Sequence, residues 1–223
     1  MPTYEGLRLK VLKYWRLGLA NYRKKQLKST DFTIISNNCW GGMIYESYNL
    51  PKESPTVGSF FIAEDYIEFL SDLKGYVNGK LTFIKPEQSR WKNMPQVSED
   101  KRFGQYPVGV LSNGKKTIEI FFLHYRSEQE AREKWERRIR RINWDKLLVK
   151  FNDQNGCTEA DVDRFIKLSF KNKLFFTCKR WKNIQEEDYT LIQQFFKHDF
   201  IMSSYESFGK NKYMDITSVI NHL

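Results

Sequence analysis

The chain has 223 residues, of which 16% are aromatic and 29% are charged. This length and aromatic content allow one large domain with a substantial core and exclude an intrinsically disordered chain. The sequence contains no apolar run near the ~20 residues that cross a membrane, and charges interrupt residues 7–19, where a signal peptide would be apolar. Three cysteines without a CxxC pair and three widely separated histidines predict neither a disulfide framework nor a zinc site. We therefore expect a cytoplasmic protein without a structural metal.

The formal charge of +10 is concentrated near the N-terminus, where residues 1–30 carry +7. Residues 5–28 read as one helix with an apolar stripe at three- and four-residue spacing: Leu7, Val11, Trp15, Leu19 and Tyr22. We predict that this stripe packs on the core and leaves a solvated basic face. The alternative is a helix that lies on an anionic membrane surface, at the inner face of the membrane. Because the basic charge is confined to one helix, we expect no nucleic-acid partner.

From residue 32 onward, strand-like segments alternate with segments of helical periodicity. After the basic helix of residues 1–30, we predict a single α/β domain over residues 31–223, a three-layer sandwich with a mixed, mostly parallel sheet. The expected strands are 32–36, 59–62, 81–84, 107–111, 117–123, 147–151, 174–178 and 200–202. The expected helices are 43–48, 63–76, 127–143, 158–169, 186–198 and the C-terminal segment from 215. Asn113-Gly114 predicts one hairpin, and residues 86–106 read as a long surface loop.

The stretch FTIISNNCWGG, residues 32–42, is the best candidate for a functional site. A buried strand here delivers two amides, a thiol and a glycine pair to the edge of a sheet, where α/β proteins bind ligands. We expect the helix start beside Cys39 to lower the thiol pKa and make this residue a nucleophile. Donors to an oxyanion or a phosphate are expected from Asn37, Asn38, Gly41 and Gly42. The alternative is that Cys39 is a small buried hydrophobe and that the glycines serve close packing.

A thiol nucleophile needs a base, and His124 is the best of the three histidines because it follows the strand 117–123. If this strand runs parallel to the strand 32–36, the imidazole emerges beside Cys39 on one rim of the sheet. Tyr125 is expected to belong to the same site. The plainer interpretation is a histidine that only ends the strand.

Further ligand contacts are expected from polar residues after another strand and within the long loop: Asn152, Asp153, Arg90, Trp91 and Lys92. Amide and carboxylate groups suit sugar hydroxyls, and an arginine beside a tryptophan suits an anion and a sugar face. A simple turn after the strand and a solvated loop with one anchoring tryptophan are the alternatives. Glu64 and Asp65 read as favourable anions at a helix start, with acid–base chemistry as the alternative.

Three blocks carry a resemblance to a known family: SNNCWGG, HYRSEQEAREKWERRIRRIN and VKFNDQNG. From Phe32 to His198 the chain resembles a bacterial family of undefined function that is usually labelled exopolysaccharide biosynthesis protein. The resemblance implies a cytosolic, single-domain α/β protein of surface-polysaccharide assembly, and it transfers no catalytic residue. The Asn-Cys dipeptide after the first strand is also similar to one in polysaccharide acetyltransferases with a hydrolase-like α/β fold.

Two classes of function remain open from the sequence. An enzyme would transfer or hydrolyse an acyl group, with Cys39 as nucleophile, His124 as base and acyl-CoA as a candidate cofactor. A binding module would hold a glycan precursor or a nucleotide sugar and dock at the membrane through residues 5–28. A glycosyltransferase is the weaker third alternative, because the one DxD pattern, Asp161-Val162-Asp163, lies in an expected helix.

Overall fold

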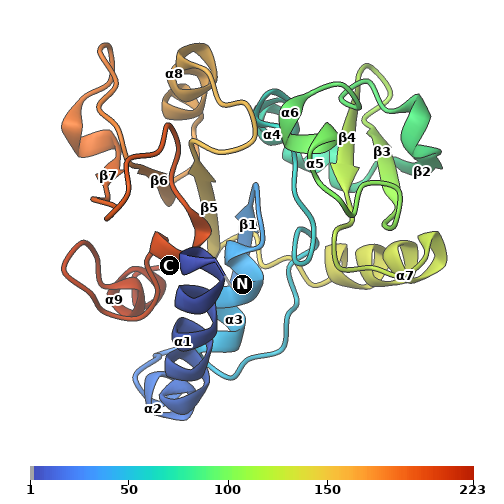
Figure 1. The fold of residues 1–223 in the computed structure, drawn as a ribbon. Helices are drawn as coiled ribbons and strands as arrows, with labels where there is room; N and C mark the ends of the chain where they lie inside the picture. Colours follow the sequence, from blue (N-terminus) through green and yellow to red (C-terminus); the bar gives the residue numbers. More distant parts are fainter. Residues whose placement is uncertain (1–2) are drawn as a thin grey trace.

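The computed structural model describes residues 3–223 and has an α/β fold with two sheets (Figure 1). The larger sheet is parallel, in the order β1-β5-β6-β7: Thr33–Ser36, Leu147–Asn152, Lys173–Thr177 and Thr190–Leu191. The smaller sheet is antiparallel, in the order β2-β3-β4: Lys80–Ile84, Val108–Ser112 and Thr117–Phe121. The predicted α/β class and the predicted hairpin, β3–β4, are confirmed. The strands expected in one mixed sheet are divided between two sheets, because the hairpin pairs with β2.

The helices begin and end close to the predicted positions in most cases. They are α1 (Tyr4–Gly18), α2 (Ala20–Lys25), α3 (Trp40–Ser47), α4 (Ala63–Ser71), α5 (Leu73–Val77), α6 (Pro95–Ser98), α7 (Glu128–Ile139), α8 (Glu159–Lys167) and α9 (Ile216–Asn221). Two expected helices are each divided in two, the first at Leu19 and the second at Asp72, whose φ of −142° is not helical. The long loop 86–106 contains α6 and the short 3₁₀ helix η1 (Pro86–Gln88).

Helices cover both faces of the parallel sheet, which makes three layers. Successive side chains of a strand point to opposite faces. Ile34 therefore packs with α3 and α9, whereas its neighbour Ile35 packs with α4 and α8. Strands buried on both faces read as continuous apolar runs, which is why β1 was recognisable from the sequence.

The helix expected over residues 186–198 is wrong. Residues 186–188 form the 3₁₀ turn η2, and Thr190–Leu191 pairs with β6 as the edge strand β7. Ile192 is buried, but Phe195 and Phe196 are exposed, so the apolar residues do not fall on one helical face. Residues 200–202 form no strand in the structure. Tertiary pairing with β6 overrides the helical pattern here.

The segment 54–62 connects the two sheets. Phe60 exchanges two backbone hydrogen bonds of 2.9 Å with Phe121 at the end of β4. Phe61 donates its amide to the Asn37 carbonyl at 3.0 Å, just beyond β1. The predicted strand 59–62 is therefore reduced to a single bridge. This bridge fixes the end of β4 beside the end of β1.

The prediction that the apolar stripe of the N-terminal helix packs on the core is wrong. Leu7, Val11 and Trp15 are 56%, 53% and 67% exposed, whereas Arg16 and Arg23 of α1 and α2 are buried. Arg16 lies 3.6 Å from the Glu46 carboxylate, and burial lowers the pKa of Arg16. The helix is thus attached through charged residues and turns its apolar side outward. None of the helices within residues 3–223 combines the length and the apolar character that crossing a bilayer requires.

Candidate active site

The loop between β1 and α3 is held by hydrogen bonds of its own side chains. Ser36 Oγ donates to the Asn38 carbonyl (2.8 Å) and accepts the Gly41 amide (3.1 Å). Asn38 Oδ1 accepts the Trp40 amide at 3.1 Å. Short polar side chains of this kind satisfy the unpaired amides of a first helical turn. The sequence SNN therefore fixes where α3 begins and places Cys39 at its N-cap position.

The glycine pair lets α3 approach its neighbours closely. A Cβ on Gly41 would lie 3.0 Å from Ser36 Oγ, and a Cβ on Gly42 would lie 3.0 Å from Val57 Cγ1. The Gly41 amide donates to Ser36 and is not free for a ligand. Close packing therefore accounts for Gly41, whereas Gly42 lines the cavity beside Cys39.

Cys39 and His124 lie side by side, with 3.3 Å between Sγ and Nε2. The expected reason, two parallel strands of one sheet, is wrong, since β1 and β4 belong to different sheets. The connecting segment brings the two residues together instead, because His124 donates its backbone amide to the Gly58 carbonyl at 3.0 Å. Gly58 has φ +81°, and a Cβ there would lie 3.1 Å from the Tyr125 ring. Both the backbone and the available space require glycine at this position.

The surroundings favour the uncharged form of both members of the pair. Burial, aided by the carboxylate of Glu206, raises the pKa of the Cys39 thiol to about 11. Burial also lowers the pKa of His124, and the cations Arg102 and Lys52 lower it further. The expectation that the helix start lowers the thiol pKa is wrong, because desolvation outweighs the helix dipole. A neutral imidazole beside a neutral thiol suits proton transfer during attack rather than a stored thiolate.

The pair opens into a cavity of about 580 Å³, which we call the cysteine pocket. Its walls come from α1, α3, the segment 52–58, the turn at residues 124–125, α7 and residues 203–206. The charged lining residues are Arg16, Lys52, Lys134, Arg138, Glu46 and Glu206. Cations thus outnumber carboxylates four to two in this lining. Glu206 pairs with the buried Lys150, Arg16 and Lys52 lie 3.6 Å and 3.9 Å from Glu46, and Lys134 pairs with Glu130. Arg138 is the lining cation without a carboxylate partner in the described chain. Within the described chain, the Nε atoms of Arg16 and Arg138 are buried without a hydrogen-bond partner. This lining favours an anionic ligand.

A second hollow of about 390 Å³ also borders Cys39. It shares Asn38, Cys39 and Ser203 with the cysteine pocket, and its lining includes Gln96, Glu99 and Arg102 of the long loop. The loop 86–106 therefore reaches the site through its second half. The thiol lies where two hollows meet, an arrangement that can hold two molecules beside one sulfur.

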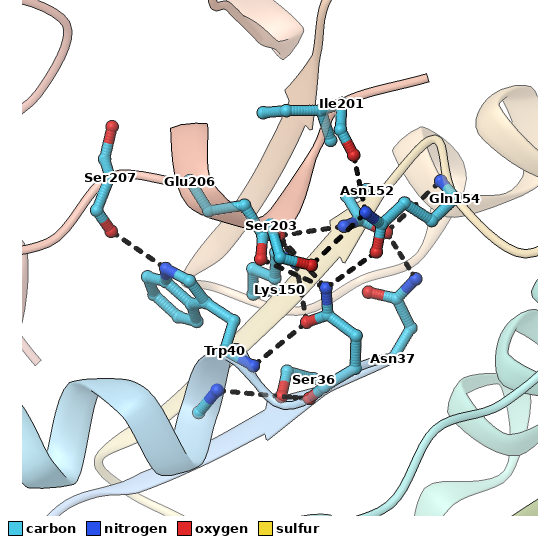
Figure 2. Close-up of polar contacts among 12 residues, drawn as sticks. Ser36, Asn37, Trp40, Lys150, Asn152, Gln154, Ile201, Ser203, Glu206 and Ser207 are labelled. Atoms are coloured by element: carbon cyan, nitrogen blue, oxygen red, sulfur yellow. Dashed lines mark hydrogen bonds and ion pairs between the residues drawn. The ribbon is translucent and has the colours of Figure 1, made fainter. Parts of the chain in front are cut away.

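Behind the thiol lies a fully buried polar cluster centred on the ion pair of Lys150 and Glu206 (Figure 2). Lys150 Nζ also donates to Asn38 Oδ1 at 3.1 Å, and Asn38 Nδ2 donates to Glu206 Oε2 at 3.1 Å. Asn152 Nδ2 donates to Glu206 Oε1 at 2.8 Å, and Asn37 Nδ2 donates to Asn152 Oδ1 at 2.7 Å. Burial lowers the pKa of Lys150, while the Glu206 carboxylate opposes that shift. The amide groups of Asn37, Asn38 and Asn152 thus donate within the protein and position the loop that carries Cys39.

Tyr125 and Asp153 also make internal contacts. Tyr125 lines the cysteine pocket, and its hydroxyl donates to the Val57 carbonyl at 2.6 Å. Asp153 Oδ1 accepts the Ile201 amide at 2.6 Å, and Oδ2 accepts the Thr177 hydroxyl at 2.6 Å. Asp153 therefore attaches the C-terminal segment to the parallel sheet.

Arg90, Trp91 and Lys92 line neither hollow beside Cys39. Arg90 forms an ion pair with Asp65, and Trp91 Nε1 donates to Asp65 Oδ2 at 2.6 Å. Lys92 Nζ donates to the Glu87 carbonyl at 2.8 Å. The structure thus separates these three residues from the candidate active site.

Sequence reasoning missed the basic lining of the cysteine pocket. Arg16 and Lys134 lie on helices far from Cys39 in the sequence, and no local pattern marks them. Arg138 did carry a signal, because it follows Ala131 and Trp135 at helical spacing on the buried stripe of α7. A buried arginine on such a stripe is paired or functional, and its Nη1 donates to Tyr125 Oη at 2.5 Å.

The fold and this site define an α/β protein with a cysteine–histidine pair at the edge of a parallel sheet. Residues 11–223 match the family described as Domain of unknown function (DUF1919), and the chain belongs to this family. It is also similar to a protein of Haemophilus influenzae described as an uncharacterized protein, with 32% identity over 217 residues that cover 96% of this chain and 95% of the relative. Neither description specifies a reaction.

Proposed function

We propose that the protein is an acyltransferase or acyl hydrolase in which Cys39 is the nucleophile and His124 is the general base. The observation that carries this proposal is the 3.3 Å distance between Sγ and Nε2 at the mouth of a cavity of about 580 Å³. That distance is within reach for proton transfer, and the volume lies in the range of small-molecule sites, about 300–1,000 Å³. Among the three cysteines, Cys39 alone contacts a histidine ring within the described chain.

The reaction would proceed in two balanced steps. Cys39 Sγ attacks the carbonyl carbon of the acyl donor, the thiol proton passes to His124 Nε2, and the leaving group departs with that proton. The thioester formed on Cys39 is then attacked by water or by a sugar hydroxyl. His124 takes the proton of the attacking group and returns it to the sulfur, which restores the thiol.

An anionic donor fits the site best. The cysteine pocket carries four cationic side chains against two carboxylates, and one of the four, Arg138, has no carboxylate partner in the described chain. Acyl-CoA carries both an activated acyl group and a diphosphate, which arginine side chains bind well. The second hollow, which meets the first at Cys39, would receive the acceptor.

The polysaccharide context of this proposal comes from the sequence blocks SNNCWGG, HYRSEQEAREKWERRIRRIN and VKFNDQNG, with their resemblance to proteins labelled exopolysaccharide biosynthesis. A sugar hydroxyl of a cytoplasmic glycan precursor would then accept the acyl group. Formation of the thioester on Cys39 can be tested without knowing the acceptor.

The test is a reaction with p-nitrophenyl acetate, an activated ester. We expect a burst of p-nitrophenolate and one acetyl group on Cys39, located by peptide mass spectrometry. Cys178 provides a matched control, because burial raises its pKa to about 11 as well and no histidine ring contacts its sulfur in the described chain. Cys39→Ser should remove the burst, and Cys178→Ser should leave it unchanged. An equal acetyl load on both cysteines would contradict the proposal.

A non-catalytic binding module is the second candidate, and the raised pKa of Cys39 favours it. The cysteine pocket would then hold an anionic glycan precursor or nucleotide sugar without reaction. A thermal-shift comparison distinguishes the two functions, since a bound ligand raises the unfolding temperature by linkage. Stabilisation by a nucleotide sugar that persists in Cys39→Ser, together with no acetyl burst in the native chain, would favour the binding module.

A further inference from the structure

Eight of the twelve large apolar side chains that are exposed in the described chain lie on α1, on α2 or on the residue between them. They are Tyr4, Leu7, Val11, Tyr14, Trp15, Leu17, Leu19 and Tyr22. We call this set the docking face. Tyr14 reaches 78% exposure. Isolated apolar residues are ordinary on a protein surface, but eight of them gathered on two consecutive helices point to an interaction site.

The opposite side of α1 explains why the docking face is not part of the core. Glu5 accepts the Ser204 hydroxyl at 2.5 Å, and Arg16 lies 3.6 Å from Glu46. Arg23 Nη1 donates to the Ser47 carbonyl at 3.1 Å. A surface helix normally buries its apolar side and exposes its charges. Here charged residues attach the helix and the apolar side stays exposed, with Trp15, Leu19 and Tyr22 lining an open hollow of about 850 Å³ beside residues 204–222.

The charge around the docking face identifies the kind of partner. Lys10, Lys13, Lys24, Lys25 and Lys28 are all exposed on the same two helices and the turn that follows. The single acidic residue of segment 4–28 is Glu5, which bonds to Ser204 on the inward side. Two copies of such a face would repel each other, so a second copy of this chain is disfavoured. An anionic surface is favoured instead.

The composition of the face points to a lipid surface. Tyrosine and tryptophan gather where lipid headgroups meet the hydrocarbon, because one end of each ring system is polar. Lysine side chains can extend from the flank of an apolar stripe to anionic headgroups. A second segment extends the patch, since Tyr4 contacts Phe195 and Phe196 with ring centroids 6.0 Å and 5.0 Å apart. Lys197 follows them and is exposed.

We infer that α1, α2 and the loop at Phe195–Phe196 form a docking surface for anionic membranes. The protein binds the bilayer from one side and does not cross it. Leu9 and Arg16 on the inward side of α1 line the cysteine pocket, so the same helix borders both the membrane and the candidate active site. Membrane binding rests on α1 and does not require that Cys39 reacts.

The test is cosedimentation of the full chain with vesicles. We expect binding to vesicles of equal parts phosphatidylcholine and phosphatidylglycerol, little binding to pure phosphatidylcholine, and weakening by salt. Leu7→Ser combined with Trp15→Ser should lower the affinity by about tenfold or more, because both side chains lose apolar contact with lipid. Lys10→Glu combined with Lys13→Glu should lower it on the anionic vesicles as well.

Matched controls come from exposed residues outside the docking face. Trp144→Ser, and Lys101→Glu combined with Lys115→Glu, should leave vesicle binding unchanged. Circular dichroism should show that all variants fold. Cys39→Ser should bind vesicles like the native chain, which separates this inference from the proposed chemistry. Absence of binding to the anionic vesicles would overturn the inference, and so would light scattering that shows a dimer lost in Leu7→Ser with Trp15→Ser.

Discussion

Two polar regions of this molecule were predicted as ligand sites, and they differ in how many of their groups are already used. At the end of β1, Cys39 Sγ and His124 Nε2 contact each other and face a cavity. Near the start of α4, Arg90 and Trp91 donate to Asp65, which also accepts the Glu119 amide at 2.9 Å. The first region, which we call the open region, keeps Cys39 and His124 beside a cavity. The second, which we call the closed region, uses Arg90 and Trp91 to fasten a loop.

The comparison shows that residue type alone does not define a site. An arginine beside a tryptophan can bind an anion and a sugar, but here Arg90 Nη2 and Trp91 Nε1 both bond to the buried carboxylate of Asp65. What distinguishes the two regions is the set of internal partners, which only the tertiary structure supplies. Substitutions in the two regions should therefore have different effects on reactivity, stability and ligand binding.

The largest effect is expected from removal of the base in the open region. His124→Gln keeps a polar side chain of similar size but cannot accept the thiol proton. Acetylation of Cys39 by p-nitrophenyl acetate should slow by about 10²–10⁴-fold, the usual contribution of a positioned general base. The rate in the native chain should rise with pH as the His124 imidazolium loses its proton, below the ordinary histidine pKa, and should be level around neutral pH. Reaction of Cys178, measured in the same digest, serves as the control and should not change.

The stability of the fold should depend strongly on the buried ion pair of Lys150 and Glu206 behind the open region. Lys150→Met leaves Glu206 as an unpaired charge in the interior, which costs about 3–5 kcal/mol of unfolding free energy. Urea denaturation measures this loss. Adding Glu206→Leu removes the orphaned charge and should restore part of the stability. If Lys150→Met alone were neutral, the ion pair would not hold the loop that carries Cys39.

In the closed region, ionisation of Asp65 should make the unfolding free energy depend on pH. Burial raises the pKa of Asp65 to about 6 in the folded state, against about 3.9 in an unfolded chain. Between these values the folded state binds more protons, so the contribution of Asp65 to stability is present below pH 4 and is lost as pH rises to 6. Asp65→Asn should flatten this part of the stability profile, measured by urea denaturation at several pH values. An unchanged slope would mean that Asp65 is ionised throughout.

The fold was largely predictable because its signals are local. The apolar run 32–36 and the Ser127 cap each act over a few residues and appear in the structure where expected. The hairpin at Asn113-Gly114 also forms, although only Gly114 of this pair adopts a positive φ. The segment 186–198 was not predictable, because Thr190–Leu191 becomes a strand only through its partner β6. The sequence predicts the apolar stripe of α1 but not that it is exposed, because the contacts of Arg16 and Arg23 with α3 place the charged side of the helix against the protein.

The candidate site was predictable only in part, for a similar reason. The meeting of Cys39 and His124 was expected, yet the route through Gly58 and the Phe60–Phe121 bridge was not, since it joins two sheets. No local sequence pattern predicts that the side chains of Asn37 and Asn38 donate hydrogen bonds within a buried cluster. The sequence identifies which residues can do chemistry, whereas their availability depends on neighbours far along the chain.

The smallest expected effects come from two exposed lysines, one in each region. Lys52 lines the cysteine pocket beside Cys39, whereas Lys92 lies with Arg90 and donates to the Glu87 carbonyl. Replacing either lysine by alanine should change the unfolding free energy by no more than about 0.5 kcal/mol, as is usual at exposed positions. Of these two variants, only Lys52→Ala should reduce the thermal stabilisation by acetyl-CoA, because Lys52 lines the cysteine pocket and Lys92 does not. An equal reduction in Lys92→Ala would mean that the ligand also reaches the closed region, and the distinction between the two regions would fail.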